Sequence, residues 1–167
     1  MNILEKFREI RTFVFDMDGV LTDNTLLHLN DTEWLRRTNM KDGHAIKLAG
    51  VKGYKVALIS GSTSEPVRAR LKHLGVEDVY MGIDDKKEKL QAYIKENQLD
   101  PEKIMYMGDD VKDYPAMLLV GLPCCPADAV GEVREISKYI SPYKGGEGCA
   151  RDVVEKVLKL HGNWELH

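Results

Sequence analysis

TFVFDMDGVLTD, residues 12–23, begins with apolar and β-branched residues and ends in an acidic turn that contains a glycine. The run Thr12–Phe15 predicts a short buried strand, because a strand packed on both faces reads as a continuous apolar run. Asp16 and Asp18 follow that strand two residues apart, and Gly19 lets the backbone turn tightly behind them. The stretch therefore predicts a strand whose carboxyl end carries two carboxylates.

Four more short apolar runs follow, separated by segments with helical periodicity. They lie at residues 55–59, 79–81, 104–107 and 122–125. Strands that alternate with helices are typical of βαβ units, which build a parallel sheet with right-handed crossovers. With no repeat, linker or low-complexity stretch in the chain, we predict one α/β domain over residues 1–167. Its architecture is three-layer and Rossmann-like, with a central parallel sheet.

Apolar residues at positions i, i+4 and i+7 mark two of the helical segments. The two sets are Val67, Leu71 and Leu74, and Val153, Val157 and Leu160. Ser64 with Pro66 just after it, and Asp100 directly before Pro101, are typical of helix starts.

Residues 24–39 break the alternation of strands and helices. Their pattern predicts two short strands around Asn30-Asp31, which form a β-hairpin. Ligands of open α/β sheets bind beyond the carboxyl ends of the strands, so a hairpin directly after the acidic turn would overhang the site as a flap or an interface element. No insertion is large enough for a cap domain, and Trp34 in the hairpin is expected to pack at an interface.

Chemically active side chains follow the predicted strands. They are Asp16 and Asp18 after the first, Ser60 and Gly61 after the second, Lys86 at the helix after the third, and Asp109 and Asp110 after the fourth. A doubly wound sheet brings the carboxyl ends of its strands to one edge, so these residues are expected to meet.

The types of these residues predict phosphoryl transfer. Clustered carboxylates without a Cys or His cluster select a hard cation, and Mg²⁺ uses one or two carboxylates and keeps several waters. An ionised Asp16 is suited to act as a nucleophile that forms a phospho-enzyme, and Asp18 to protonate the leaving alkoxide and then activate water. Ser60 and the backbone N–H groups after it, at a helix amino end, would bind phosphate oxygens, and Lys86 would neutralise the transferring group.

The composition excludes several other classes of protein. With 24 Lys and Arg against 27 Asp and Glu, the net charge of −3 provides no basic field for nucleic acid or anionic lipid. The amino terminus does not resemble a signal peptide, and no apolar run is long enough to span a bilayer. Three cysteines without a C-x-x-C pair indicate reduced thiols rather than disulfides or zinc, with Cys124 and Cys125 buried as small apolar residues. We therefore expect a cytoplasmic protein.

The motifs DMDGVLTD, ISG and GDDVKD, together with Lys86, resemble in their order the four signature motifs of the haloacid dehalogenase-like hydrolase superfamily. The resemblance implies that Asp16 is the nucleophile, Asp18 the acid and base, and Ser60 and Lys86 phosphate contacts. It also implies that Mg²⁺ is held by Asp16, the backbone carbonyl of Asp18, and Asp109. Asp110 and Asp113 are secondary candidates in the same motif.

Within that superfamily the chain most resembles the capless 3-deoxy-D-manno-octulosonate 8-phosphate phosphatases, from about residue 11 to residue 158. The shared stretches include NMKDG at 39–43 and GGEGCARD at 145–152. The resemblance implies hydrolysis of this sugar-acid phosphate through an aspartyl-phosphate, in the synthesis of lipopolysaccharide precursors. It also implies a homotetramer whose subunits wall each other's pockets, with Arg70 reaching in from a neighbour to the substrate's carboxylate.

One position departs from the family, which commonly carries Arg where this chain has Ser62. Relatives that act on nine-carbon keto acids carry Glu there, so a nine-carbon 2-keto-3-deoxy acid 9-phosphate is an alternative substrate. Two other classes are a phospho-acceptor signalling domain, whose acceptor Asp would follow the third strand where Met81-Gly82 stands here, and an inactive scaffold homologue. The glycines of the carboxyl-terminal segment 144–161 suit either a plain loop or a mobile tail that closes over a pocket.

Overall fold

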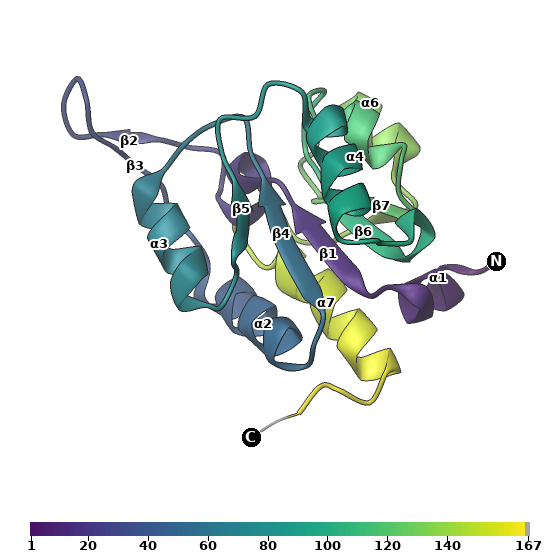
Figure 1. Ribbon diagram of the computed structural model, residues 1–167. Coiled ribbons are helices and arrows are strands. Elements are labelled where there is room, and N and C mark those ends of the chain that lie inside the picture. Colours follow the sequence, from purple (N-terminus) through teal and green to yellow (C-terminus); the bar gives the residue numbers. More distant parts are fainter. Residues whose placement is uncertain (166–167) are drawn as a thin grey trace.

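The computed structural model describes residues 1–165, which contain a central six-stranded sheet (Figure 1). The strands lie in the order β5-β4-β1-β6-β7-β8, and every neighbouring pair is parallel. Their bounds are Thr12–Phe15 (β1), Lys55–Ile59 (β4), Asp78–Tyr80 (β5), Ile104–Met107 (β6), Leu122–Cys125 (β7) and Tyr139–Ile140 (β8). β1 therefore lies inside the sheet, between β4 and β6.

Helices cover both faces of this sheet. One face packs against α1 (Ile3–Glu9), α2 (Met40–Val51), α3 (Glu65–His73) and α7 (Cys149–Leu160), and the other against α4 (Lys86–Glu96), α5 (Tyr114–Met117) and α6 (Gly131–Ile136). Residues of β1 alternate between the two cores, with Phe13 and Phe15 in the first and Val14 in the second. The predicted three-layer α/β fold is confirmed.

The five strands predicted for the sheet all form, and one further strand was missed. β8 was not predicted, because two residues carry too little pattern to be recognised without their partner strand β7. Asp100-Pro101 does start a helix, although it is only a single 3₁₀ turn, Pro101–Lys103. Asp100 does cap that turn by accepting from the Glu102 N–H at 3.0 Å. The turn ends at once because β6 begins at Ile104.

The predicted start of α3 and both apolar stripes agree with the structure. Ser64 is the N-cap of α3, and its Oγ accepts from the Val67 N–H at 3.4 Å. The stripes are buried or partly buried in the core through Val67, Leu71, Leu74, Val153, Val157 and Leu160. These contacts fix α3 and α7 on the same side of the sheet.

The predicted hairpin consists of β2 (Leu27–His28) and β3 (Trp34–Leu35), which pair antiparallel. The Asn30 side chain organises its loop by accepting from the backbone N–H groups of Thr32 and Glu33, each at 3.0 Å. The hairpin projects away from the body of the domain at the end of the sheet where β1 and β4 finish (Figure 1).

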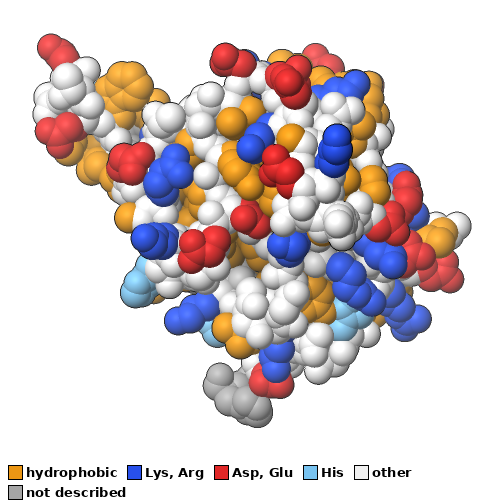
Figure 2. Space-filling model, viewed as in Figure 1, with side chains coloured by type: hydrophobic (Ala, Val, Ile, Leu, Met, Phe, Trp, Pro, Cys, Tyr) orange, Lys and Arg blue, Asp and Glu red, His pale blue; other side chains and the backbone are white. Residues whose placement is uncertain are grey.

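Apolar side chains of this hairpin are exposed to solvent, as Figure 2 shows at the projection. They are Leu26, Leu27, Leu29, Trp34 and Leu35, between 40% and 60% exposed. Apolar side chains gathered on a protruding segment are typical of a surface that contacts another protein. The described chain has no cap domain that could cover them.

Two expectations from composition can be compared with the structure. The side chains of Cys124, Cys125 and Cys149 are all buried and free, and burial raises the pKa of the Cys124 thiol well above its ordinary value. These thiols are therefore protonated core residues. Among residues 1–165, no helix has the length and apolar character that crossing a bilayer requires.

Candidate active site

The carboxyl ends of β1, β4 and β6 and the start of α4 surround one hollow of about 200 Å³. All predicted site residues except Arg70 line it: Asp16, Asp18, Ser60, Gly61, Lys86 and Asp109. The parallel sheet thus brings together side chains that are up to 93 positions apart in sequence, from Asp16 to Asp109.

Asp16 is held at the floor of this hollow. Its Oδ1 accepts from its neighbour's backbone N–H, that of Met17, at 2.7 Å and lies 2.9 Å from Lys86 Nζ. Burial raises the pKa of the Asp16 carboxyl well above its ordinary value, and the Asp113 carboxylate adds to the rise while Lys86 opposes it. A buried carboxylate with one oxygen fixed by two donors presents its second oxygen in a defined direction.

The turn after β1 brings the backbone close to Asp109. The segment η1, Met17–Leu21, is kinked at Asp18 and Gly19, and Gly19 has a φ of +86°. A side chain at this position would be strained, and its Cβ would lie 1.8 Å from Asp109 Oδ2. Glycine is therefore required here on two grounds, backbone conformation and space.

Lys86 is the buried cation of the site. Its Nζ donates to Asp113 Oδ1 at 2.7 Å and contacts Asp16 Oδ1. Burial alone lowers the pKa of Lys86, but the carboxylates of Asp113 and Asp16 outweigh this and raise it. Lys86 is therefore charged, and it stands beside the carboxylate of Asp16.

Asp113 is a buried residue that holds both Lys86 and the loop after β6 in place. Its Oδ1 also accepts from Tyr106 Oη at 2.9 Å, and its Oδ2 from the backbone N–H groups of Asp109 and Asp110 at 3.0 and 3.3 Å. Both oxygens are thus occupied, and Asp113 fixes the loop that carries Asp109. The sequence placed Asp113 only as a secondary candidate and did not indicate Tyr106, because a strand residue gives no sign of which side chain it will bond.

The same carboxylates could hold a metal ion. Oxygens of Asp16, Asp109 and Asp113 lie within 4.8 Å of one another. Asp109 Oδ1 is one of only two buried side-chain polar atoms in the described residues that lack a hydrogen-bond partner. Burial raises the pKa of Asp109 to about 6. Three buried carboxylates beside a single ammonium leave an excess of negative charge. These residues therefore suit an additional cation that prefers oxygen ligands.

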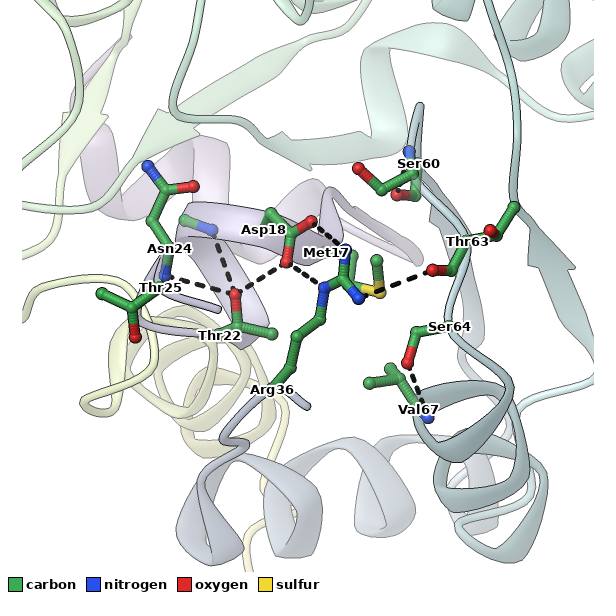
Figure 3. Close-up of polar contacts among 12 residues, drawn as sticks. Met17, Asp18, Thr22, Asn24, Thr25, Arg36, Ser60, Thr63, Ser64 and Val67 are labelled. Carbon is green, nitrogen blue, oxygen red and sulfur yellow. Dashed lines mark hydrogen bonds and ion pairs between the residues drawn. The ribbon is translucent and has the colours of Figure 1, made fainter. Parts of the chain in front are cut away.

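Asp18 lies at the rim of the hollow and is bound by an arginine from the hairpin (Figure 3). Arg36 Nε donates to Asp18 Oδ1 at 2.8 Å, and Arg36 Nη2 to Asp18 Oδ2 at 3.1 Å. The Thr22 hydroxyl donates to the same Oδ1 at 3.0 Å. Sequence reasoning missed Arg36, because nothing in the pattern LRRT shows which of two adjacent arginines turns inward.

Ser60 lies in the loop between β4 and α3. It is buried, and its Oγ accepts from the Ser62 N–H at 3.1 Å. The prediction that Ser60 stands at a helix amino end is wrong, because α3 begins only at Glu65 and is capped by Ser64. The N–H groups after Ser60 therefore belong to a loop, and the N–H of Ser62 is already bound by the Ser60 hydroxyl oxygen.

The glycine-rich segment packs against the acidic turn. Gly146 N–H donates to Val20 O at 2.9 Å, and a Cβ on Gly145 would lie 1.9 Å from Gly19 O. Glycine is thus needed at 145 because two backbone segments touch there. Residues 145–146 therefore form part of the support of η1.

Arg70 is the predicted site residue that the single chain does not bring to the hollow. It lies on α3, where its Nη2 is 3.8 Å from Met40 Sδ, and it lines a separate small hollow with Asp42. Among the described residues no carboxylate forms an ion pair with it. Arg70 is therefore not part of this chain's own acidic hollow.

This fold, with its acidic cluster and lysine at the carboxyl ends of the strands, is that of a haloacid dehalogenase-like hydrolase. The sequence model of that family matches residues 42–121. Among relatives, the chain is 32% identical over 165 residues to a 3-deoxy-D-manno-octulosonate 8-phosphate phosphatase of Yersinia pestis, covering 96% of this chain and 88% of the relative. An Escherichia coli K12 enzyme of the same description is 32% identical over 161 residues, covering 96% and 86%.

Solved structures give the same result. The Yersinia pestis phosphatase superimposes with a TM-score of 0.93 at 30% identity, covering 96% of this chain and 87% of that one. The Moraxella catarrhalis phosphatase, solved with magnesium, phosphate and 3-deoxy-D-manno-octulosonate (KDO), gives 0.92 at 29% identity, covering 96% and 92%. The chain belongs to the 3-deoxy-D-manno-octulosonate 8-phosphate phosphatase family of haloacid dehalogenase-like hydrolases.

Proposed function

We propose that the protein hydrolyses KDO 8-phosphate to KDO and phosphate, with Mg²⁺, through an aspartyl-phosphate on Asp16. The observation that carries the proposal is the buried Asp16, held by Lys86 and placed beside Asp109, in a chain 32% identical to enzymes of that name. The reaction would take place in the cytoplasm and supply lipopolysaccharide synthesis.

The first step transfers the phosphoryl group to the enzyme. With Oδ1 of Asp16 bound by Met17 N–H and Lys86, Oδ2 attacks phosphorus in line with the sugar oxygen. The bond between phosphorus and that oxygen breaks, and Asp18 gives its proton to the departing alkoxide. Lys86, Ser60 and the Gly61 N–H hold the phosphoryl oxygens during the transfer.

The second step returns the enzyme to its starting state. Asp18, now a carboxylate, removes a proton from a water molecule as that water attacks phosphorus. The bond from phosphorus to Asp16 breaks, phosphate leaves, and Asp16 is again ionised. Mg²⁺, held by Asp16, Asp109 and the Asp18 carbonyl, would neutralise the carboxylates and the phosphate when bound.

The exact sugar acid is the finer part of the proposal. Ser62, where the resemblance implies Arg or Glu, lines the hollow, so this chain offers neither of those side chains to a substrate there. KDO 8-phosphate is favoured because the matching curated relatives and the magnesium-bound structure carry that name. A nine-carbon acid 9-phosphate is the alternative to be compared with it.

An assay of phosphate release tests the proposed function. Purified protein with Mg²⁺ should hydrolyse KDO 8-phosphate faster than nine-carbon acid phosphates and simple hexose phosphates. EDTA should abolish the activity and added Mg²⁺ restore it, because three buried carboxylates face a single ammonium. Activity that survives exhaustive chelation would contradict the metal site, and no release from any sugar-acid phosphate would contradict the function.

We further propose a homotetramer in which Arg70 of one subunit binds the substrate carboxylate in the hollow of its neighbour. Support comes from three features of residues 1–165: the exposed apolar hairpin, the lack of a cap, and an Arg70 that lies outside its own hollow without an ion pair to a carboxylate. A guanidinium can bind a carboxylate through two parallel hydrogen bonds.

Mixing two variants that are each impaired on KDO 8-phosphate tests this arrangement. Arg70→Ala should raise KM strongly for KDO 8-phosphate and leave hydrolysis of p-nitrophenyl phosphate, which has no carboxylate, nearly unchanged. Refolded together in equal amounts, Asp16→Asn and Arg70→Ala subunits should recover on the order of a quarter of wild-type activity, because some sites combine an intact Asp16 with a neighbour's Arg70. No recovery would mean that Arg70 does not act between subunits.

A further inference from the structure

Arg36 turns away from the exposed face of the hairpin. It follows β3 directly, and its side chain is only 5% exposed, whereas the adjacent Arg37 lies in solvent. An arginine is rarely buried unless it is paired, because removing its charge from water is costly. Burial of the Arg36 guanidinium therefore requires a charge partner, and that partner is the Asp18 carboxylate.

The pair has the geometry of a fork. Nε and Nη2 of Arg36 donate to the two different oxygens of the Asp18 carboxylate, at 2.8 and 3.1 Å (Figure 3). Two parallel bonds fix the plane of the carboxylate as well as its position. The Thr22 hydroxyl adds a third donor at 3.0 Å. Asp18 is thus held in one orientation although it stands on a kinked turn rather than in a helix or strand.

Arg36 also links three separate segments around the hollow. It stands on the hairpin, it binds Asp18 on η1, and its Nη1 lies 3.5 Å from the backbone oxygen of Thr63 in the loop after β4. That loop carries Ser60. The base of the hairpin is joined to η1 by a bridge between Thr22 and Thr38 as well.

We propose that Arg36 is a positioning residue for Asp18 and that, through it, the hairpin controls the rate of the chemical steps. This rests on the proposed function, in which Asp18 exchanges protons with the sugar oxygen and with water. Such a transfer requires the carboxylate within hydrogen-bond reach of the reacting oxygen, and a misplacement of about 1 Å costs on the order of 10²-fold in rate. Arg36 offers hydrogen-bond donors and no acceptor, and both oxygens of Asp18 bind it, so its effect passes through Asp18.

Substitution of Arg36 should lower kcat and leave KM nearly unchanged. For Arg36→Ala we expect a loss of about 10- to 100-fold in kcat on KDO 8-phosphate, because Asp18 samples unproductive orientations. Arg36→Lys, which keeps the charge but offers no fork, should fall between that variant and the wild type. Arg37→Ala is the matched control and should behave as the wild type. Beryllium fluoride, which mimics the phospho-enzyme on Asp16, should bind all four proteins equally.

A double-mutant cycle tests whether Arg36 acts through Asp18. In the Asp18→Asn background, Arg36→Ala should cost little further in kcat, because the carboxylate that it positions is already absent. The full loss in both backgrounds would overturn the proposal. So would an Arg36→Ala enzyme with wild-type kcat, or one whose loss follows a lower melting temperature and weaker beryllium fluoride binding. A wild type that releases no phosphate would instead refute the proposed function itself.

Discussion

Asp16→Asn is expected to abolish turnover, with a loss of at least about 10³-fold, because an amide oxygen cannot replace the carboxylate as a nucleophile. Asp16 follows β1 directly and lines the hollow, where it contacts Lys86 and lies next to Asp109. Steady-state phosphate release from KDO 8-phosphate at saturating Mg²⁺ measures this. An Asp16→Asn enzyme that retains more than about a tenth of wild-type activity would contradict covalent catalysis on this residue.

The same variant should remain folded. Burial and the nearby Asp113 raise the pKa of Asp16. The ionised side chain therefore lowers the free energy of unfolding. Asparagine removes that charge and leaves Lys86 paired with Asp113 at 2.7 Å. The melting temperature without metal should therefore equal or exceed that of the wild type. A large drop would mean that the lost activity reflects unfolding.

Asp18→Asn is the second substitution with a large expected effect. Removing a general acid and base should lower kcat on the order of 10²–10⁴-fold, with a smaller effect on substrate binding. An amide can still accept from Arg36 through its oxygen, but it cannot give or take the proton. With p-nitrophenyl phosphate, whose leaving group departs without a proton from Asp18, the first step should still occur. The second step needs Asp18 to activate water, so the phospho-enzyme should accumulate in this variant.

Asp23→Asn is a suitable control for Asp18→Asn. Asp23 belongs to the same motif, but its side chain accepts from the N–H and the hydroxyl of Thr25. Rapid-quench measurement of phospho-enzyme and free phosphate should show accumulation in Asp18→Asn alone. If Asp18→Asn and Asp23→Asn both turned over at the wild-type rate, the assignment of acid and base to Asp18 would be wrong.

Much of the fold could be predicted because its signals are local. Each of the five strands that were predicted is an apolar run bounded by polar turns, and β1 ends at the two carboxylates. Lys86 stands in the charged run DDKKEK, which by itself is typical of a solvated helix face. The order of the motifs nevertheless singled it out, and the structure places it buried against Asp16.

The remaining features depend on contacts across the fold. Arg36 and Arg37 are adjacent and chemically alike, and only the path of the hairpin decides that Arg36 meets Asp18. The support of the site by Tyr106 and Asp113 likewise requires β6 and α5 to be in place. Arg70 is a further example, because the contact that we propose for it lies on another subunit.

The most direct test of the account is the identification of the phosphorylated residue. The Asp18→Asn protein, incubated with p-nitrophenyl phosphate and Mg²⁺ and then treated with borohydride, should contain homoserine in place of one aspartate, since borohydride reduces acyl phosphates to the alcohol. Peptide mass spectrometry should locate that change at residue 16. Modification at another aspartate, or phosphate release with no trapped aspartate in either this variant or the wild type, would contradict the aspartyl-phosphate on Asp16.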